Sequence, residues 1–244
     1  ETGPISVFAQ GVPDMVGGGT VEIVTEEDVR WAEPPDRDEA GSPNVVGAVA
    51  LGQSILSLQE IGMEALADHE AVLTAHALRR LREIDGIELY GLTDPERAGE
   101  RVGVIPMNLQ GIDHYKLAAV LSFEGGIGVR NGCFCAHPYL LRLLKVPGET
   151  ALRHQQDIED GTRAGLPGLV RISFGCYNTI EEVDYLVEIL ARIAAGEIQG
   201  EYEQDPLSGA YWPRSYEPDY DAFFALQPGV RASIHAYPRA RCGV

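Results

Sequence analysis

The feature that most constrains the fold is the alternation of helical and strand-like segments between residues 45 and 195. Apolar residues recur at helical spacing over 45–61, over 64–84 and again after Thr179, with short aliphatic runs between the helical segments. The pattern predicts strands at 21–24, 87–90, 102–109, 127–130 and 169–174, and further helices at 114–121 and 139–144. Helices that alternate with strands in this way indicate an α/β unit.

Two of the predicted helices carry specific signals. The 45–61 segment has small and aliphatic residues such as Val49, Ile55 and Leu56 along it, which predicts a largely buried helix. The last helix opens with a Thr179 to Glu182 capping box, in which each side chain bonds the backbone N–H of the other residue. After Gly200 the periodic patterns end. Tyr, Pro, Trp and acidic residues dominate 201–228, and 229–244 is predicted to be an irregular tail. The expected role of this acidic segment is to cover a domain surface.

Charge restricts the partners that the chain can have. Nineteen basic and 37 acidic residues give a formal net charge of −18, which argues against nucleic acid and against an anionic membrane. No apolar run approaches the roughly 20 residues that a membrane helix requires. Four cysteines in 244 residues do not form a disulfide scaffold, so we expect a reduced, cytoplasmic setting. The Glu1-Thr2-Gly3-Pro4 start suggests processing, an expression scar or a fragment.

A glycine-containing loop between 128 and 138 carries two cysteines, Cys133 and Cys135. Such a loop can present a thiolate, and the nearby Arg130 would favour the ionised form. Free cysteines also pack inside as small apolar residues. A zinc site based on Cys-x-Cys-x-His lacks a further ligand pair at suitable spacing. The sequence therefore gives a reactive thiol and a structural thiol as alternatives.

Arg171 lies inside an apolar strand, where a guanidinium needs an acceptor. A ligand carboxylate held by the two-pronged guanidinium would satisfy it, and so would a structural ion pair with one of the many acidic residues. Cys176, five residues further on, is predicted to be a core residue.

The segment Glu39-Ala40-Gly41-Ser42-Pro43-Asn44 precedes a predicted helix. A hydroxyl and backbone amides at a helix start suit phosphate, although the same string is more often an N-cap and a turn.

In this order, the three segments resemble cysteine desulfurases of the class V aminotransferases, which are fold-type I pyridoxal-phosphate enzymes. The resemblance covers about residues 8–195, and this part of the chain is similar to the C-terminal portion of such enzymes. It is carried by Gly17-Gly18-Gly19, Trp31-Ala32-Glu33-Pro34-Pro35, Glu39–Asn44, Val129-Arg130-Asn131-Gly132-x-x-Cys135-Ala136-x-Pro138, Arg171–Phe174 and Tyr177-Asn178-Thr179.

The resemblance implies a role for five residues. Cys135 matches the cysteine that attacks the substrate sulfur and carries the persulfide, and Arg171 matches the arginine that binds the substrate α-carboxylate. Arg130 matches the arginine at the base of the cysteine loop. Gly41 and Ser42 match a cofactor-binding segment whose hydroxyl reaches the cofactor phosphate of the other subunit. The Cys-Phe-Cys setting of Cys133 resembles that of molybdenum-cofactor sulfurases.

The implied organisation has three parts: the end of a large cofactor-binding domain (1–48), a small C-terminal α/β domain with a mostly antiparallel sheet (49–198) and an acidic tail (199–244). The implied reaction removes sulfur from cysteine and leaves alanine, in a homodimer that passes sulfur to an acceptor protein. Other class V chemistry (transamination, epimerisation or lyase activity) and an inactive dimerisation or binding module are the alternatives.

One departure from the family concerns pyridoxal 5'-phosphate itself. The family binds this cofactor through a lysine in a Ser-x-His-Lys-like segment of the large domain. The chain contains two lysines, Lys116 and Lys145, and the sequence around neither one matches that segment. We therefore expect the cofactor lysine to lie upstream of this sequence and the 244 residues alone to be inactive.

Overall fold

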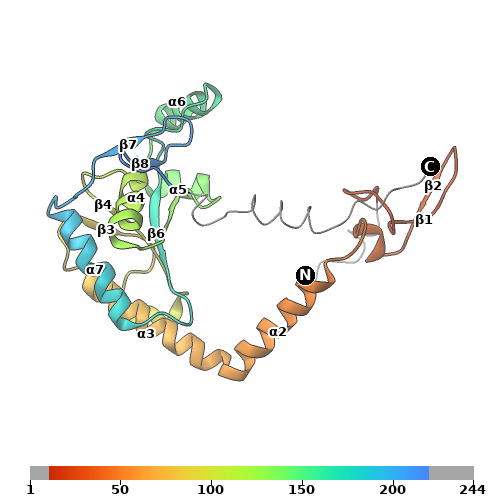
Figure 1. Cartoon of the computed structure of the whole chain (residues 1–244), viewed down its shortest axis with the longest axis horizontal. Helices are drawn as coiled ribbons and strands as arrows, with labels where there is room; N and C mark the ends of the chain where they lie inside the picture. Colours follow the sequence, from red (N-terminus) through yellow and green to blue (C-terminus); the bar gives the residue numbers. More distant parts are fainter. Residues whose placement is uncertain (1–10, 220–244) are drawn as a thin grey trace, which may run out of the picture. The chain divides into compact units, whose positions relative to one another are not determined.

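The structure, a computed structural model, describes residues 11–219 and falls into two compact units, Glu1–Ala65 and Leu66–Val244. In the first unit β1 (Val21–Val24) pairs antiparallel with β2 (Val29–Trp31). A short 3-10 helix (Asp36–Asp38) follows, and then the long helix α2 (Val45–Ile61), drawn in orange in Figure 1.

Helix α2 forms where the sequence predicts it, but its predicted burial is wrong. None of its residues is buried, and Val46 and Val49 are 81% and 68% exposed. The reason is that α2 is apolar on all sides, while the first unit provides no surface that covers it. Within residues 11–219 no single helix is long and apolar enough to cross a membrane. Helices α2 and α3 reach the required length and apolar character only when they are taken together, and the chain bends between them.

The second unit is built on a four-stranded antiparallel sheet in the order β3-β4-β6-β5. The predicted α/β class with an antiparallel sheet is thereby confirmed. Its strands are β3 (Ile87–Leu89), β4 (Val104–Leu109), β5 (Arg130–Gly132) and β6 (Leu169–Ser173). Its helices are α3 (Met63–Leu81), α4 (His114–Gly125), α5 (His137–Leu143), α6 (Gly148–Glu159) and α7 (Ile180–Ala194), and a 3-10 helix spans Pro95–Glu100.

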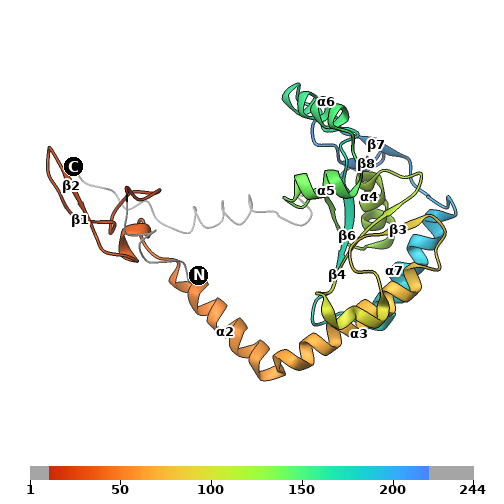
Figure 2. The same cartoon turned by 180° about the vertical axis from the view of Figure 1, so that it is seen from behind.

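The two faces of this sheet differ in character because side chains alternate along a strand. On one face Ile105 lies opposite Ile172 and Met107 opposite Val170, and all four are buried against α3, α4 and α7. We call this the helix-packed face; Figures 1 and 2 show α3 and α7 side by side next to it. On the other face Arg171 lies opposite Pro106 on one side and Arg130 on the other. We call it the arginine face.

The capping box predicted at the last helix is confirmed. The Glu182 N–H donates to Thr179 Oγ1 at 3.3 Å, and the Thr179 N–H donates to the Glu182 carboxylate at 3.0 Å. The apolar stripe of α7 is buried in the core as predicted, with Leu190 fully buried. Since six residues separate the end of β6 from the start of α7, this cap fixes the chain just beyond the strand that carries Arg171.

The strand predicted at 127–130 lies instead at 130–132, and β2 and the two 3-10 helices were not predicted. Two longer regions were also missed. Helix α6 lies where no helix is expected, and residues after 200 form a hairpin of β7 (Tyr202–Gln204) and β8 (Tyr211–Pro213). The prediction that periodic structure ends at Gly200 is therefore wrong for 202–213. The rings of Trp212 and Tyr216 lie 6.0 and 5.0 Å from that of Phe123 on α4, so the hairpin covers part of this helix. The tail predicted at 229–244 lies outside the described residues.

Candidate functional site: a thiol loop beside two arginines

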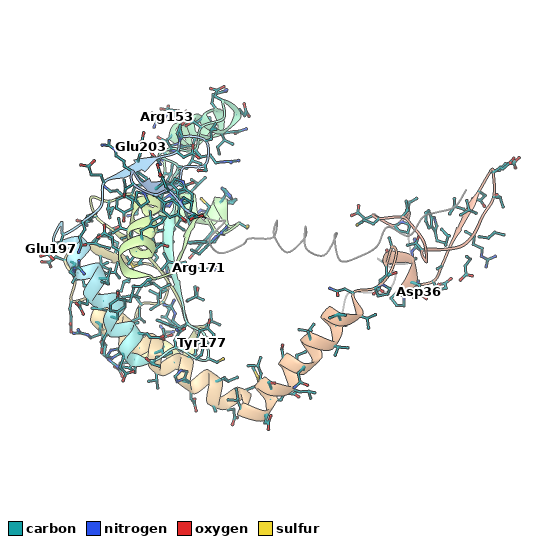
Figure 3. The ribbon with its side chains drawn as sticks, viewed as in Figure 1. Asp36, Arg153, Arg171, Tyr177, Glu197 and Glu203 are labelled. Carbon is teal, nitrogen blue, oxygen red and sulfur yellow. The ribbon has the colours of Figure 1, made fainter. Side chains whose placement is uncertain are left out.

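The centre of the candidate site is a pair of arginines on neighbouring strands. Arg171 on β6 and Arg130 on the edge strand β5 are direct cross-strand partners. Like charges placed directly opposite each other on one sheet face are destabilising. Figure 3 labels Arg171 on its strand. An arrangement of this kind is favourable when an anion lies between the two guanidinium groups.

Within the described part of the chain, no carboxylate neutralises this pair. Other arginines are paired, for example Arg80 with Glu83 at 2.6 Å and Arg97 with Glu100 at 2.5 Å. Neither Arg130 nor Arg171 has an ion pair with any described residue, and the Nε atom of Arg171 is buried without a hydrogen-bond partner there. A structural ion pair, the alternative left open by the sequence, does not form among residues 11–219. A buried donor without an acceptor costs free energy, which a ligand carboxylate would recover.

The loop that follows β5 holds its two cysteines in different surroundings. The Ala136 N–H donates to the Cys133 carbonyl at 2.9 Å, and the two residues between them have positive φ, 52° for Phe134 and 60° for Cys135. This is the φ pattern of a type I′ turn, which residues other than Gly, Asn and Asp adopt only at a cost. The turn leaves Cys135 exposed to solvent. The loop thus presents the predicted nucleophile on strained backbone, a frequent feature of functional sites.

Cys133 is partly enclosed. Its thiol donates a hydrogen bond to the Pro167 carbonyl at 3.2 Å, and burial raises its pKa. It also lines a groove of about 550 Å³ between α5, α6 and the 166–167 segment, together with apolar side chains including Leu141, Leu152 and Ile158. A neutral, hydrogen-bonded thiol is a poorer nucleophile than a thiolate. Of the two cysteines, the surroundings therefore favour Cys135 as the reactive one.

Phe134, between the two cysteines, contacts the arginine pair. Its ring lies under the Arg171 guanidinium, with 5.1 Å between Cζ and the ring centroid. A cation at this distance from an aromatic face is attracted to the negative potential of the ring. Through this contact between Phe134 and Arg171, the loop that carries Cys135 is linked to the arginine face.

The edge strand and its loop are supported from the helix-packed face. The side chain of His114, at the start of α4, is buried. Its Nε2 lies 2.9 Å from the Leu166 carbonyl oxygen, and its Nδ1 lies 3.3 Å from the side-chain Nδ2 of Asn131. These partners fit a neutral ring that donates from Nε2 and accepts at Nδ1. Burial is the main cause that lowers the pKa of His114. Gly168 allows this close approach, because a Cβ there would lie 2.5 Å from His114 Nε2 and 2.9 Å from Gly132 Cα.

The predicted cofactor-binding residues Gly41 and Ser42 belong to the first unit. Gly41 has φ of +81° and its N–H donates to the Gly18 carbonyl at 2.8 Å, which joins the two glycine-containing segments that the sequence singles out. The side chain of Asn44 caps α2 by accepting from the Gly47 N–H at 2.9 Å. The capping reading of this segment is therefore correct, and Ser42 stands exposed one turn before the helix.

The chain's two lysines do not fit the role of a cofactor anchor at the arginine face. Lys116 is on α4, which packs on the opposite side of the sheet, and Lys145 is an exposed residue after α5. Arg171, with its unpartnered Nε, fits a substrate carboxylate, but neither lysine fits a Schiff base with a cofactor beside it. Among residues 11–219, no three His, Cys, Asp or Glu side chains come together as a metal site.

The prediction that Cys176 is a core residue is wrong, because the residue is exposed. It lies in a turn between β6 and α7, where the Asn178 N–H donates to the Gly175 carbonyl at 3.1 Å and Asn178 Oδ1 accepts from the Gly175 N–H at 2.7 Å. Cys176 and Tyr177 are the two central residues of this turn, and Tyr177, labelled in Figure 3, is 80% exposed.

Comparison with known proteins supports the resemblance to class V aminotransferases and cysteine desulfurases. The family model for aminotransferase class V matches residues 6–186. A probable cysteine desulfurase from Mycobacterium leprae is 34% identical over 186 residues, which are 76% of this chain and 26% of the relative. A probable cysteine desulfurase from Staphylococcus aureus is 35% identical over 180 residues, which are 74% of this chain and 37% of the relative.

Solved structures give the same result. The apo cysteine desulfurase from Thermococcus onnurineus matches with a TM-score of 0.58 and 30% identity, over 75% of this chain and 40% of that one. A cysteine desulfurase from Escherichia coli, at 23% identity and a TM-score of 0.61 over 81% of this chain and 42% of that one, shows the shared fold. The chain spans about a quarter to two-fifths of the length of these proteins. The fraction of each relative that is matched does not confirm the expectation that this chain corresponds to the C-terminal portion of those proteins.

Proposed function

We propose, from the premise that the chain belongs to the aminotransferase class-V family, that it supplies the carboxylate-binding and sulfur-accepting residues of a pyridoxal-phosphate-dependent cysteine desulfurase. One observation carries the proposal: the half-buried and unpaired Arg171 is joined through a single ring to the loop that exposes Cys135.

In this proposal Arg171 binds the α-carboxylate of cysteine. Its planar guanidinium offers parallel N–H donors that match the two carboxylate oxygens, and the buried Nε–H gains the acceptor that it lacks. Arg130, the direct cross-strand partner of Arg171, adds a second positive charge beside the bound carboxylate. Binding the carboxylate fixes one end of the substrate, so the other end has a defined position.

Cys135 takes the sulfur. Its thiolate forms a bond to the sulfur of the substrate while the carbon–sulfur bond breaks, and the carbon fragment leaves as alanine after protonation. When bound, pyridoxal phosphate supplies the electron sink that makes breaking this bond feasible. The exposed position of Cys135 lets its persulfide meet an acceptor protein, whereas Cys133 is partly enclosed.

The proposal places the cofactor lysine outside these 244 residues. It follows that the chain alone releases no sulfide from cysteine. We further propose that Gly41 and Ser42 contact the phosphate of the cofactor in the neighbouring subunit of a homodimer, and that the protein acts in the cytoplasm.

Product analysis on the full-length protein tests the proposal. Wild-type protein supplied with pyridoxal phosphate, cysteine and a thiol reductant such as dithiothreitol, which reduces the Cys135 persulfide back to the thiol, should release alanine and sulfide in equal amounts. Cys135→Ala should abolish both. Cys176→Ala is the matched control, because this exposed cysteine lies on another loop and should leave the rate unchanged. Undiminished sulfide release by Cys135→Ala, or a keto acid or epimer as the product, would show other class V chemistry.

A further inference from the structure

The side chain of Phe134 has no role in the chemistry proposed above, yet it is the described residue whose ring lies against Arg171. We infer that Phe134 is a positioning residue that holds the Arg171 guanidinium so that its in-plane donors meet a carboxylate. The inference rests on the proposed carboxylate site but not on sulfur transfer.

The first support is geometric. The Arg171 Cζ lies over the Phe134 ring, 5.1 Å from its centroid, so the ring attracts the guanidinium as a cation without accepting an ordinary hydrogen bond from it. The N–H donors therefore stay available to a ligand. The donor on Nε is already shielded from bulk water and has no partner among the described residues, so a ligand carboxylate would supply an acceptor that it lacks. A guanidinium that this contact already restrains loses less freedom on binding a planar carboxylate, which raises the affinity.

The second support is charge. Arg130 lies opposite Arg171 and repels it, and among residues 11–219 no carboxylate compensates either group. Without a restraint, this repulsion would turn the Arg171 side chain away from Arg130 toward solvent. The electron-rich face of Phe134 offers a counter-attraction that leaves both hydrogen-bonding prongs unused. An aspartate in the same place would hold Arg171 equally well but would occupy those prongs.

The third support is the backbone at Phe134. Its φ of 52° is unfavourable for an aromatic residue, and glycine would adopt it freely. The turn alone therefore does not call for phenylalanine at this position. A ring kept at a strained position, where it meets a cation, indicates a task for the side chain itself.

The backbone strain supplies a matched set of variants. Phe134→Gly keeps the positive φ and removes the ring, Phe134→Tyr keeps the ring, and Phe134→Leu keeps an apolar side chain without a ring. A purely structural role predicts that Phe134→Gly preserves the site. The positioning role predicts that Phe134→Gly and Phe134→Leu both damage it and that Phe134→Tyr does not.

The experiment follows the Arg171 Nε–H resonance by NMR in the 244-residue chain, assigned with Arg171→Met, while L-alanine is added as the probe. The ring current of Phe134 should shift this resonance in wild type and in Phe134→Tyr, and the shift should disappear in the glycine and leucine variants. The affinity for L-alanine should fall about three- to tenfold in those two variants, the ratio that corresponds to one cation–π contact. Alaninamide, which lacks the carboxylate, should not bind in any of them.

Wild-type affinity in Phe134→Gly, or no ring-current shift in wild type, would overturn the inference. In the full-length protein the glycine variant should raise KM for cysteine by the same factor and leave kcat nearly unchanged. If sulfide release instead survives Cys135→Ala, the sulfur-transfer proposal fails while the Nε–H shift and the affinity ratio still stand.

Discussion

The two faces of strand β6 have different surroundings in the second unit. Val170 and Ile172 are 0% and 4% exposed and pack among the helices, whereas Arg171 between them lies on the opposite face with an unpartnered Nε. This strand of five residues thus carries both core side chains and a charged side chain that no described residue neutralises. The difference shows that stability is concentrated on the helix-packed face, which leaves the arginine face free to bind a ligand.

The largest expected effect on stability comes from the helix-packed face. Leu190→Ala on α7 removes a fully buried side chain and should lower the free energy of unfolding by about 2–5 kcal/mol. Glu188→Ala on the exposed side of the same helix should change it by less than about 0.5 kcal/mol. Urea unfolding followed by circular dichroism measures both. A loss below about 1 kcal/mol for Leu190→Ala would mean that this face does not carry the stability of the unit.

A smaller effect should come from His114, a polar residue on the helix-packed side. Burial lowers its folded-state pKa below the ordinary 6.5, so the folded protein binds the proton less readily than the unfolded chain does. The stability from the neutral ring is therefore complete above pH 6.5 and is lost as pH falls below that value.

The measurement compares unfolding free energies of wild type and His114→Gln between pH 8 and pH 5. The wild-type value should fall in that window more steeply than that of the variant. Parallel curves would show that protonation of His114 is not coupled to folding.

The sequence predicts the elements of the second unit well because their apolar periodicity reflects a core within the chain itself. The stripe of α7 and its Thr179 cap are examples. Helix α6 was missed because it has few apolar side chains, Ala151, Leu152 and Ile158, and none of its residues is buried in the core. Helix α2 shows the opposite case: its apolar residues predict burial, but burial depends on a covering surface that the described residues do not supply.

Like the fold, the candidate site was predictable from the sequence only in part. Arg171 stands out in the sequence because a charge interrupts an apolar strand, but its pairing with Arg130 depends on strand order and register. Phe134, His114 and Gly168 were missed. The ring of Phe134 reaches Arg171 through positive φ values that no rule assigns to Phe-Cys. Gly168 offers only a weak signal, a glycine directly before a buried strand.

The smallest expected effect on stability tests the central claim, that the arginine face binds a carboxylate and does not hold the fold together. Arg171→Met keeps the length of the side chain and removes an unpaired charge, so the unfolding free energy should change by less than about 1 kcal/mol or rise. The same variant should lose the NMR shifts that L-alanine causes at the backbone amides of Arg130, Asn131 and Gly132. Arg153→Met, on exposed α6 (Figure 3), should keep both properties.

Both quantities can be obtained from one set of samples of the 244-residue chain, by L-alanine titration followed by urea unfolding. The account predicts that Arg171→Met abolishes the alanine-dependent shifts at unchanged stability. A loss of about 3 kcal/mol or more with the shifts retained would contradict it, because Arg171 would then be a structural residue and the carboxylate site would lie elsewhere.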